Sequence, residues 1–263
     1  MSETVVVILL GIVEGITEFL PVSSTGHLLL VEHWLHVQRS ELFNIVIQIG
    51  AVLAVIPIFK NRFAQCLRWR DPIGRDYALK ILAAFFITGV GGLFAKKAGW
   101  TLPHSPLPIG VALLIGGVAF IAVELLLRGR WQRSYIGWDI VLAVGIGQVI
   151  AAIFPGTSRS GATILLALLL GLNRPAATEF SFLVSIPTML AAGGWEILHE
   201  LRHQTPGTPP ENWNMVLLAS AIAAVVSFVA VKWLLRYVQT HTFVVFGWYR
   251  VAVGGLILLL MAH

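Results

Sequence analysis

Residues 11–26 read GIVEGITEFLPVSSTG, and residues 145–160 read GIGQVIAAIFPGTSRS. Aligned without a gap, the two stretches share five of their sixteen residues, including Pro21 with Pro155 and Ser24 with Ser158. Each is an apolar run that ends at a proline, which breaks a helix, and continues into hydroxyl residues, which cap the next helix. The two stretches therefore predict two helical hairpins of the same design, one in each half of the chain.

Composition places most of the chain in lipid. The 263 residues are 57% hydrophobic and 12% charged, with a mean hydropathy of +0.83, whereas soluble domains are about 25% charged. A chain of this size cannot bury so much apolar sequence in its own core. The composition therefore excludes a soluble enzyme and a disordered chain. The single Cys66 excludes a disulfide scaffold and fits no zinc or iron–sulfur spacing.

Segment lengths predict an all-α polytopic membrane protein that forms one domain over 1–263. Spanning a bilayer takes about 20 residues in a helix, and six apolar stretches meet this need. They are 42–59, 77–95, 107–127, 179–198, 214–236 and 243–261. The pairs 4–20 with 26–36 and 138–154 with 161–172 are too short or too polar, since the run 162–172 would reach only about 17 Å. We expect six transmembrane helices plus two re-entrant helical hairpins.

Charge counting predicts the orientation. If the loop 60–76 is cytoplasmic, twelve Lys and Arg residues lie on that side and four on the other, the bias typical of cytoplasmic loops. Both termini are then outside. The hairpins enter from opposite sides in an inverted-topology repeat, with repeat 1 at about 1–127 and repeat 2 at about 134–263. The net charge of +5 thus needs no nucleic-acid partner. Because 4–20 contains two Glu residues, we expect mature structure there rather than a cleaved signal.

The first hairpin tip carries two acids inside an apolar segment. Glu14 and Glu18 are four residues apart and share one helix face. Two carboxylates there repel unless a proton or a cation lies between them, and carboxylate oxygens suit Mg²⁺ or Ca²⁺. The pair is therefore a candidate divalent-cation site. The alternatives are a structural pair with an Arg and a proton relay in a transporter.

The second tip, residues 155–161, has no acid and one cation, Arg159. A helix N-terminus binds anions through its free N–H groups, and the planar guanidinium of Arg159 matches phosphate oxygens. Arg159 could instead serve as the counter-ion of Glu14 or Glu18. The alternative role of the hydroxyls is limited to hydrogen-bonding the free backbone groups of a broken helix. The residues predicted to bind phosphate are Ser23, Thr25, Thr157, Ser158, Ser160 and Gly161.

Four further residues are candidates for the same site. His27 follows the first tip and could transfer protons or attack phosphorus, although an inert capped His is the alternative. Gln48 and Ser185 are equivalent in the repeat and could line the site or join helices, and Gln148 is a further candidate lining residue. If the tips meet, the predicted site combines carboxylates, hydroxyls, one Arg and one His, which suits phosphoryl transfer on a lipid-borne phosphate.

The stretches GIVEGITEFLPVSSTGH from Gly11 and PGTSRSGAT from Pro155 resemble the undecaprenyl-pyrophosphate phosphatases of the bacitracin-resistance type. The resemblance extends over essentially the whole chain. It implies a bacterial inner-membrane enzyme that removes one phosphate from undecaprenyl pyrophosphate and so recycles the lipid carrier of cell-wall synthesis. It also implies bacitracin resistance, dependence on a divalent cation and a homodimer.

The resemblance assigns roles to six residues. Glu14 and Glu18 handle metal or protons, Ser24 and His27 serve in attack and proton transfer, and Arg159, with Ser158, holds the pyrophosphate. The nucleophile could be Ser24, His27 or a water molecule; we favour Ser24 with His27 as its base. We expect large losses of activity when Glu18, His27 or Arg159 is replaced by Ala. The alternative function is a polyprenyl-phosphate flippase that uses the same site, since inverted repeats are typical of transporters.

Overall fold

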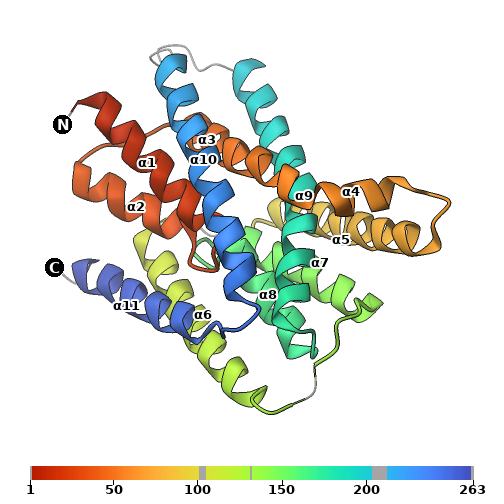
Figure 1. The fold of residues 1–263 in the computed structure, drawn as a ribbon. Coiled ribbons are helices and arrows are strands. Elements are labelled where there is room, and N and C mark those ends of the chain that lie inside the picture. The colour runs from red at the N-terminus through yellow and green to blue at the C-terminus, as the bar shows by residue number, and fades with distance from the viewer. Residues whose placement is uncertain (1, 101–104, 131, 203–211, 262–263) are drawn as a thin grey trace.

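The computed structural model describes residues 2–100, 105–130, 132–202 and 212–261, which fold into helices without a β-strand (Figure 1). In chain order the helices are α1 Glu3–Thr17, α2 Ser24–Leu35, α3 Glu41–Val55, the 3₁₀ turn η1 Ile56–Phe59, α4 Lys60–Leu67, α5 Pro72–Lys97, α6 Pro106–Leu126, α7 Trp138–Ile153, α8 Arg159–Leu169, α9 Arg174–Arg202, α10 Trp213–Tyr237 and α11 Val244–Met261.

Within the described residues, five helical stretches are long and apolar enough to cross a membrane, so the chain is a multi-pass membrane protein. They correspond to the first five predicted spans: Glu41–Leu67, Pro72–Lys97, Pro106–Leu126, Arg174–His199 and Trp213–Tyr237. The predicted span 243–261 corresponds to α11, whose described apolar stretch Val244–Leu260 is shorter. The span expected at 42–59 is longer than predicted, because the chain continues through η1 into α4.

Large apolar side chains on the outer surface fit a lipid environment. Phe86 of α5, Ile115 of α6 and Val225 of α10 are 62%, 66% and 67% exposed, although they lie in the middle of long apolar helices. In water, such a surface would drive aggregation, whereas lipid tails solvate it. The start of α1 and the end of α11 lie on the same side of the molecule (Figure 1).

Helices of the first half of the chain pack against helices of the second half. The first helix of each hairpin packs against the other half, α1 on α10 and α7 on α5, while α3 packs on α9 and α6 on α11 (Figure 1). The aligned glycines Gly11 and Gly145 mark the close approaches. A Cβ on Gly11 would lie 2.6 Å from the Ala219 oxygen, and one on Gly145 would lie 2.7 Å from Ile87 Cγ2. Corresponding helix pairs thus meet at corresponding glycines.

Candidate active site

The two hairpin tips have the same unusual backbone. Ser23 precedes α2 with φ of 74°, and Ser158 precedes α8 with φ of 68°, which is uncommon for a residue with a Cβ. Each serine caps its helix: Ser23 Oγ accepts a hydrogen bond from the Gly26 N–H at 3.3 Å, and Ser158 Oγ accepts one from the Gly161 N–H at 3.1 Å. Strained backbone of this kind persists only where its surroundings hold it, and it clusters at functional sites.

The caps correct the register of the sequence alignment. The gap-free alignment pairs Ser24 with Ser158, whereas the matching caps pair Ser23 with Ser158. The second tip contains one more residue between its proline and its capping serine, an insertion that a gap-free comparison cannot show. Ser24 and Arg159 are therefore equivalent first residues of α2 and α8.

Glu18 connects the two tips. Its Oε2 accepts a hydrogen bond from Ser24 Oγ at 2.6 Å and another from Gln48 Nε2 at 3.3 Å. Its Oε1 lies 3.5 Å from Arg159 Nη2 of the second tip. The Glu18 residue is 8% exposed, so these contacts form in a largely dry environment, where they are stronger than in water. The structure thus brings together Glu18, Ser24, Gln48 and Arg159.

His27 points away from this group. Its Nδ1 lies 2.8 Å from the Ser23 carbonyl oxygen, and its Nε2 lies 2.7 Å from Tyr249 Oη, with the two rings stacked. Both ring nitrogens are therefore engaged, Nδ1 with the first tip and Nε2 with α11. The expected pairing of His27 with Ser24 does not occur in this structure, where a carboxylate occupies the position of base instead.

Glu14 and Gln148 are equivalent in the repeat and have similar surroundings. The Glu14 residue is 1% exposed and Gln148 is 2% exposed. Neither side-chain oxygen of Glu14 and neither amide atom of Gln148 has a hydrogen-bond partner among the described residues. Buried polar atoms are nearly always partnered, so these unpartnered side chains are unusual, and they occur at the same position in both hairpins.

A cavity of about 780 Å³ opens at the tips. The predicted residues that line it are Glu18, Ser23, Ser24, Thr25, Gln48, Gln148, Ser158 and Arg159. The other predicted residues do not line it: Glu14, His27, Thr157, Ser160, Gly161 and Ser185. Ser160 Oγ donates to the Leu20 carbonyl at 3.1 Å, and Ser185 is 4% exposed on α9. Ser160 thus joins the tips and does not face the cavity.

Sequence reasoning missed two residues of α11 that contact the tips, Tyr249 and Arg250. Arg250 is 0% exposed and donates to carbonyls of both tips. The signal was present, because Arg250 is a charged residue inside a predicted membrane span, and such residues are costly and functional. Tyr249 has no comparable signal in the sequence.

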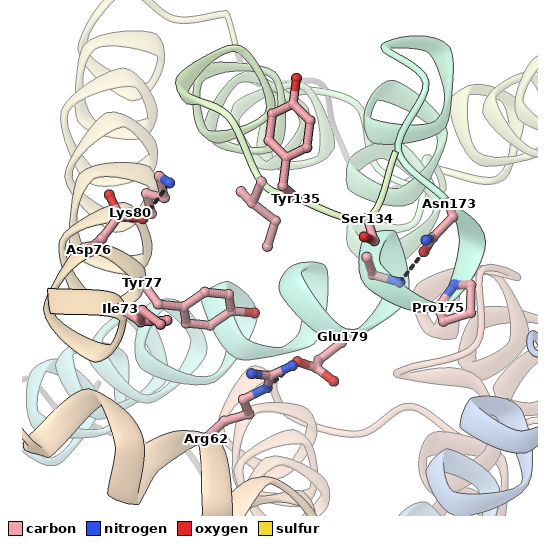
Figure 2. Close-up of a pocket in the computed structure, with 12 residues that line it drawn as sticks. Arg62, Ile73, Asp76, Tyr77, Lys80, Ser134, Tyr135, Asn173, Pro175 and Glu179 are labelled. Atoms are coloured by element: carbon pink, nitrogen blue, oxygen red, sulfur yellow. Dashed lines mark hydrogen bonds and ion pairs between the residues drawn. The ribbon is translucent and has the colours of Figure 1, made fainter. Parts of the chain in front are cut away.

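A second cavity, of about 480 Å³, lies between α4, α5, the loop before α7 and the start of α9 (Figure 2). Its charged groups neutralise one another. Arg62 Nε lies 2.6 Å from Glu179 Oε1, and Lys80 Nζ lies 2.5 Å from Asp76 Oδ2. Figure 2 shows Tyr77 and Glu179 facing the same space. None of the predicted site residues lines this cavity, so substitutions in it are suitable controls for substitutions at the tips.

Comparison with known proteins identifies the family of this chain. The family described as bacitracin resistance protein BacA matches residues 7–256. This chain belongs to that family. A relative from Rhizobium johnstonii named undecaprenyl-diphosphatase is 50% identical over 252 residues, which covers 95% of this chain and 94% of the relative. A relative of the same name from Xanthomonas oryzae pv. oryzae is 48% identical over 263 residues, with 98% and 97% covered.

Proposed function

We propose that the chain is a membrane undecaprenyl-diphosphatase, which hydrolyses undecaprenyl diphosphate to undecaprenyl phosphate and inorganic phosphate. The observation that carries the proposal is the 2.6 Å hydrogen bond from Ser24 Oγ to Glu18, in a cavity that also holds Arg159. A hydroxyl beside a base and a guanidinium is what phosphoryl transfer requires. Family membership and the names of the relatives support it. The activity recycles the carrier of cell-wall synthesis and confers bacitracin resistance.

Binding of the diphosphate follows from the second tip. The Arg159 fork can hold two phosphate oxygens, and the first N–H groups of α8 add a positive dipole end. Arg159 lies 3.5 Å from Glu18 Oε1, a long contact that a phosphate dianion can replace. Arg159 and Ser158 of the second tip therefore hold the terminal phosphate against Ser24 of the first.

The reaction then begins at Ser24. Its Oγ forms a bond to the terminal phosphorus, its proton passes to Glu18 Oε2, and the bond from that phosphorus to the bridging oxygen breaks. Undecaprenyl phosphate leaves with the bridging oxygen. Water then hydrolyses the phosphoserine, which releases inorganic phosphate and restores Ser24. His27 contributes by holding the Ser23 carbonyl, because its nitrogens do not reach Ser24.

A divalent cation fits the acidic side of the site. Both Glu14 oxygens are buried without a partner in the described part of the chain, and carboxylates are the ligands that Mg²⁺ and Ca²⁺ prefer. Glu14 and Glu18 are the residues that would hold the ion. When bound, the ion offsets the charge that develops on the phosphates.

The membrane arrangement that suits this reaction has six spans, including α11, and two re-entrant hairpins, α1–α2 and α7–α8, that meet at mid-depth. With 11 residues, α8 is about 17 Å long, too short to cross about 30 Å of hydrocarbon. The cavity continues to Lys96, Trp195 and Glu196, near the ends of α5 and α9 that charge counting puts outside. We therefore place the diphosphate entry on the outer side of the bacterial inner membrane, with both termini outside as well.

Small residues line the part of the cavity where we place the start of the lipid tail. Gly89 and Gly92 of α5 and Ala191 and Ala192 of α9 line the cavity, and a Cβ on either glycine would meet nothing within 4 Å. The first isoprene units can lie against this wall, with the rest of the tail in lipid. A homodimer stays a prediction of the family resemblance, and light scattering of the detergent complex measures it.

Phosphate release in detergent tests the proposal, because no two-sided membrane exists there. Purified protein should release phosphate from undecaprenyl or farnesyl pyrophosphate, and Ser24→Ala and Arg159→Ala should each lower the release at least about 10²-fold. Ser134→Ala and Arg62→Gln, at the second cavity, are matched controls that should keep it. Flipping of the lipid in liposomes without any release would identify a transporter and contradict the proposal.

A further inference from the structure

Arg250 of α11 is fully buried and has no acidic partner among the described residues. Its residue is 0% exposed, and no carboxylate of the described residues lies within ion-pair distance of it. An arginine removed from water must satisfy its donors, and it is normally paired with a carboxylate. The two terminal nitrogens of Arg250 donate to carbonyl oxygens, while its buried Nε has no hydrogen-bond partner among the described residues, so backbone dipoles balance its charge.

The carbonyls that Arg250 contacts belong to both hairpin tips. Nη1 donates to the Pro21 oxygen of the first tip at 3.1 Å. Nη2 donates to the Thr157 oxygen of the second tip at 2.9 Å, with the Gly156 oxygen at 3.5 Å. It also donates to the Ala112 oxygen of α6 at 3.2 Å. One guanidinium thus connects two tips that come from opposite halves of the chain.

The contacts adjoin the two strained serines. The Thr157 carbonyl is part of the peptide that leads into Ser158, and Pro21 lies two residues before Ser23. Both serines keep a positive φ, a strained conformation that persists only where the surroundings hold it. Donation from Arg250 therefore acts on the peptide that leads into Ser158 and on the Pro21–Val22 peptide, one peptide before Ser23, next to the starts of α8 and α2.

The fold leaves a space shaped for this guanidinium. A Cβ on Gly116 would lie 2.2 Å from Arg250 Nη2, and one on Gly161 would lie 2.8 Å from Nη1. Any side chain at either position would displace the guanidinium from the tip carbonyls. Gly116 is on α6 and Gly161 on α8, so two helices besides α11 make room for Arg250.

We propose that Arg250 is a positioning residue that joins the two tips and sets Ser24 of the first in register with Arg159 of the second. It does not line the cavity, so it acts on the reaction through the tip backbones rather than by touching the substrate. The inference rests on the proposed function for its readout. Since a misplacement of about 1 Å can cost about 10²-fold in rate, loss of this connection should lower kcat more than it raises KM.

The test compares three variants with wild type in the detergent assay. Arg250→Lys keeps the charge but cannot reach carbonyls of both tips, and kcat should fall about 10²-fold while KM changes less than about threefold. Gly116→Ala moves the guanidinium without changing any charge and should lower kcat in the same sense. Gly255→Ala, on the same helix as Arg250 with nothing within 4 Å of its Cβ, is the control and should match wild type.

Stability is separated from positioning by Arg174→Lys. Arg174 holds the buried Glu124 through two nitrogens, with Nε 2.9 Å from Oε1, away from the tips. This variant should lower the thermal unfolding midpoint and leave the kcat of the folded protein unchanged. If Arg250→Lys lowers the midpoint and kcat only as far as Arg174→Lys does, Arg250 is merely structural and the proposal is overturned.

Chemical rescue keeps the test decisive if Arg250→Lys does not fold. In Arg250→Ala, added methylguanidinium should restore part of kcat, while an equal concentration of methylammonium should not. Equal restoration by both ions, or kcat within twofold of wild type in both Arg250→Lys and Gly116→Ala, overturns the proposal. Absence of phosphate release by wild-type protein would instead refute the proposed function, so the two failures are distinguishable.

Discussion

The hairpins α1–α2 and α7–α8 have the same backbone and opposite chemistry. In each hairpin the chain turns after a proline, and the turn ends at a serine with positive φ. The Oγ of that serine caps the returning helix by accepting a hydrogen bond from the backbone N–H three residues later. The first hairpin carries Glu14 and Glu18, whereas the second has Gln148 and Ala152 at the aligned positions. The first residue of the returning helix is Ser24 in one and Arg159 in the other.

The difference shows how the two copies of a repeat can have different chemical roles in one site. Two acidic hairpins facing one another would repel a phosphate, and two cationic hairpins would bind it without a group to attack it. With one of each, the first tip supplies hydroxyl and base, and the second supplies the cation that holds the anion. Since each tip is incomplete alone, the proposed activity depends on their alignment.

Replacement of Glu18 should have the largest effect, because Glu18 has no acidic counterpart in the second hairpin. Glu18→Gln removes the base 2.6 Å from Ser24 and should lower kcat by about 10²–10⁴-fold. Adding Ala152→Glu, which moves the acid to the other hairpin, should not restore the rate, because only the first tip presents Ser24. Initial rates of phosphate release measure both variants. Recovery in the double variant would show that the hairpins are interchangeable.

Arg159 gives the next largest effect. Arg159→Ala removes the charged fork opposite Ser24 and should cost about 10²–10³-fold in kcat/KM. Arg159→Lys keeps the charge without the two-pronged geometry and should recover only part of this loss. Steady-state kinetics with farnesyl pyrophosphate check both values. A wild-type kcat/KM in Arg159→Ala would remove the second hairpin from the site.

Variants of the aligned residues Glu14 and Gln148 test whether the first hairpin binds a divalent cation. Chelation of divalent ions should stop phosphate release, and added Mg²⁺ or Ca²⁺ should restore it. Glu14→Gln should raise the ion concentration needed for half-maximal activity at least about tenfold, whereas Gln148→Ala should leave it unchanged. Full activity in chelator, or an equal shift in both variants, would show that the acidic hairpin holds no ion.

His27 should give the smallest effect. His27→Phe keeps the ring beside Tyr249 but loses the contacts to the Ser23 carbonyl and Tyr249, so kcat should fall by about tenfold or less. This differs from the large loss that the sequence alone suggests. A loss as large as that of Glu18→Gln would return His27 to the role of base.

Local sequence was sufficient for much of the fold. Proline followed by Ser and Thr predicted where both hairpins turn, because the proline ring and the hydroxyl caps act within a few residues. Helix length and hydropathy predicted the five long spans for the same reason. Glu18, Ser24 and Arg159 could be singled out because charges and hydroxyls stand out inside apolar segments.

What the sequence could not supply depends on contacts between distant helices. The side of α2 that bears His27 faces α11, which is set by how α11 packs on α6. The one-residue insertion before Ser158 is visible only once both caps are seen. Arg250 was present as a charge in an apolar segment, but the carbonyls that it contacts lie in both halves of the chain.

The most direct test of the account is a double-mutant cycle between Ser24 and Glu18, measured as phosphate release in detergent. If Glu18 acts by taking the proton of Ser24, Ser24→Ala, Glu18→Gln and the double variant should all lose about the same activity, because residues that act as one unit are not additive. Losses that multiply in the double variant, or near wild-type turnover in Ser24→Ala, would contradict it.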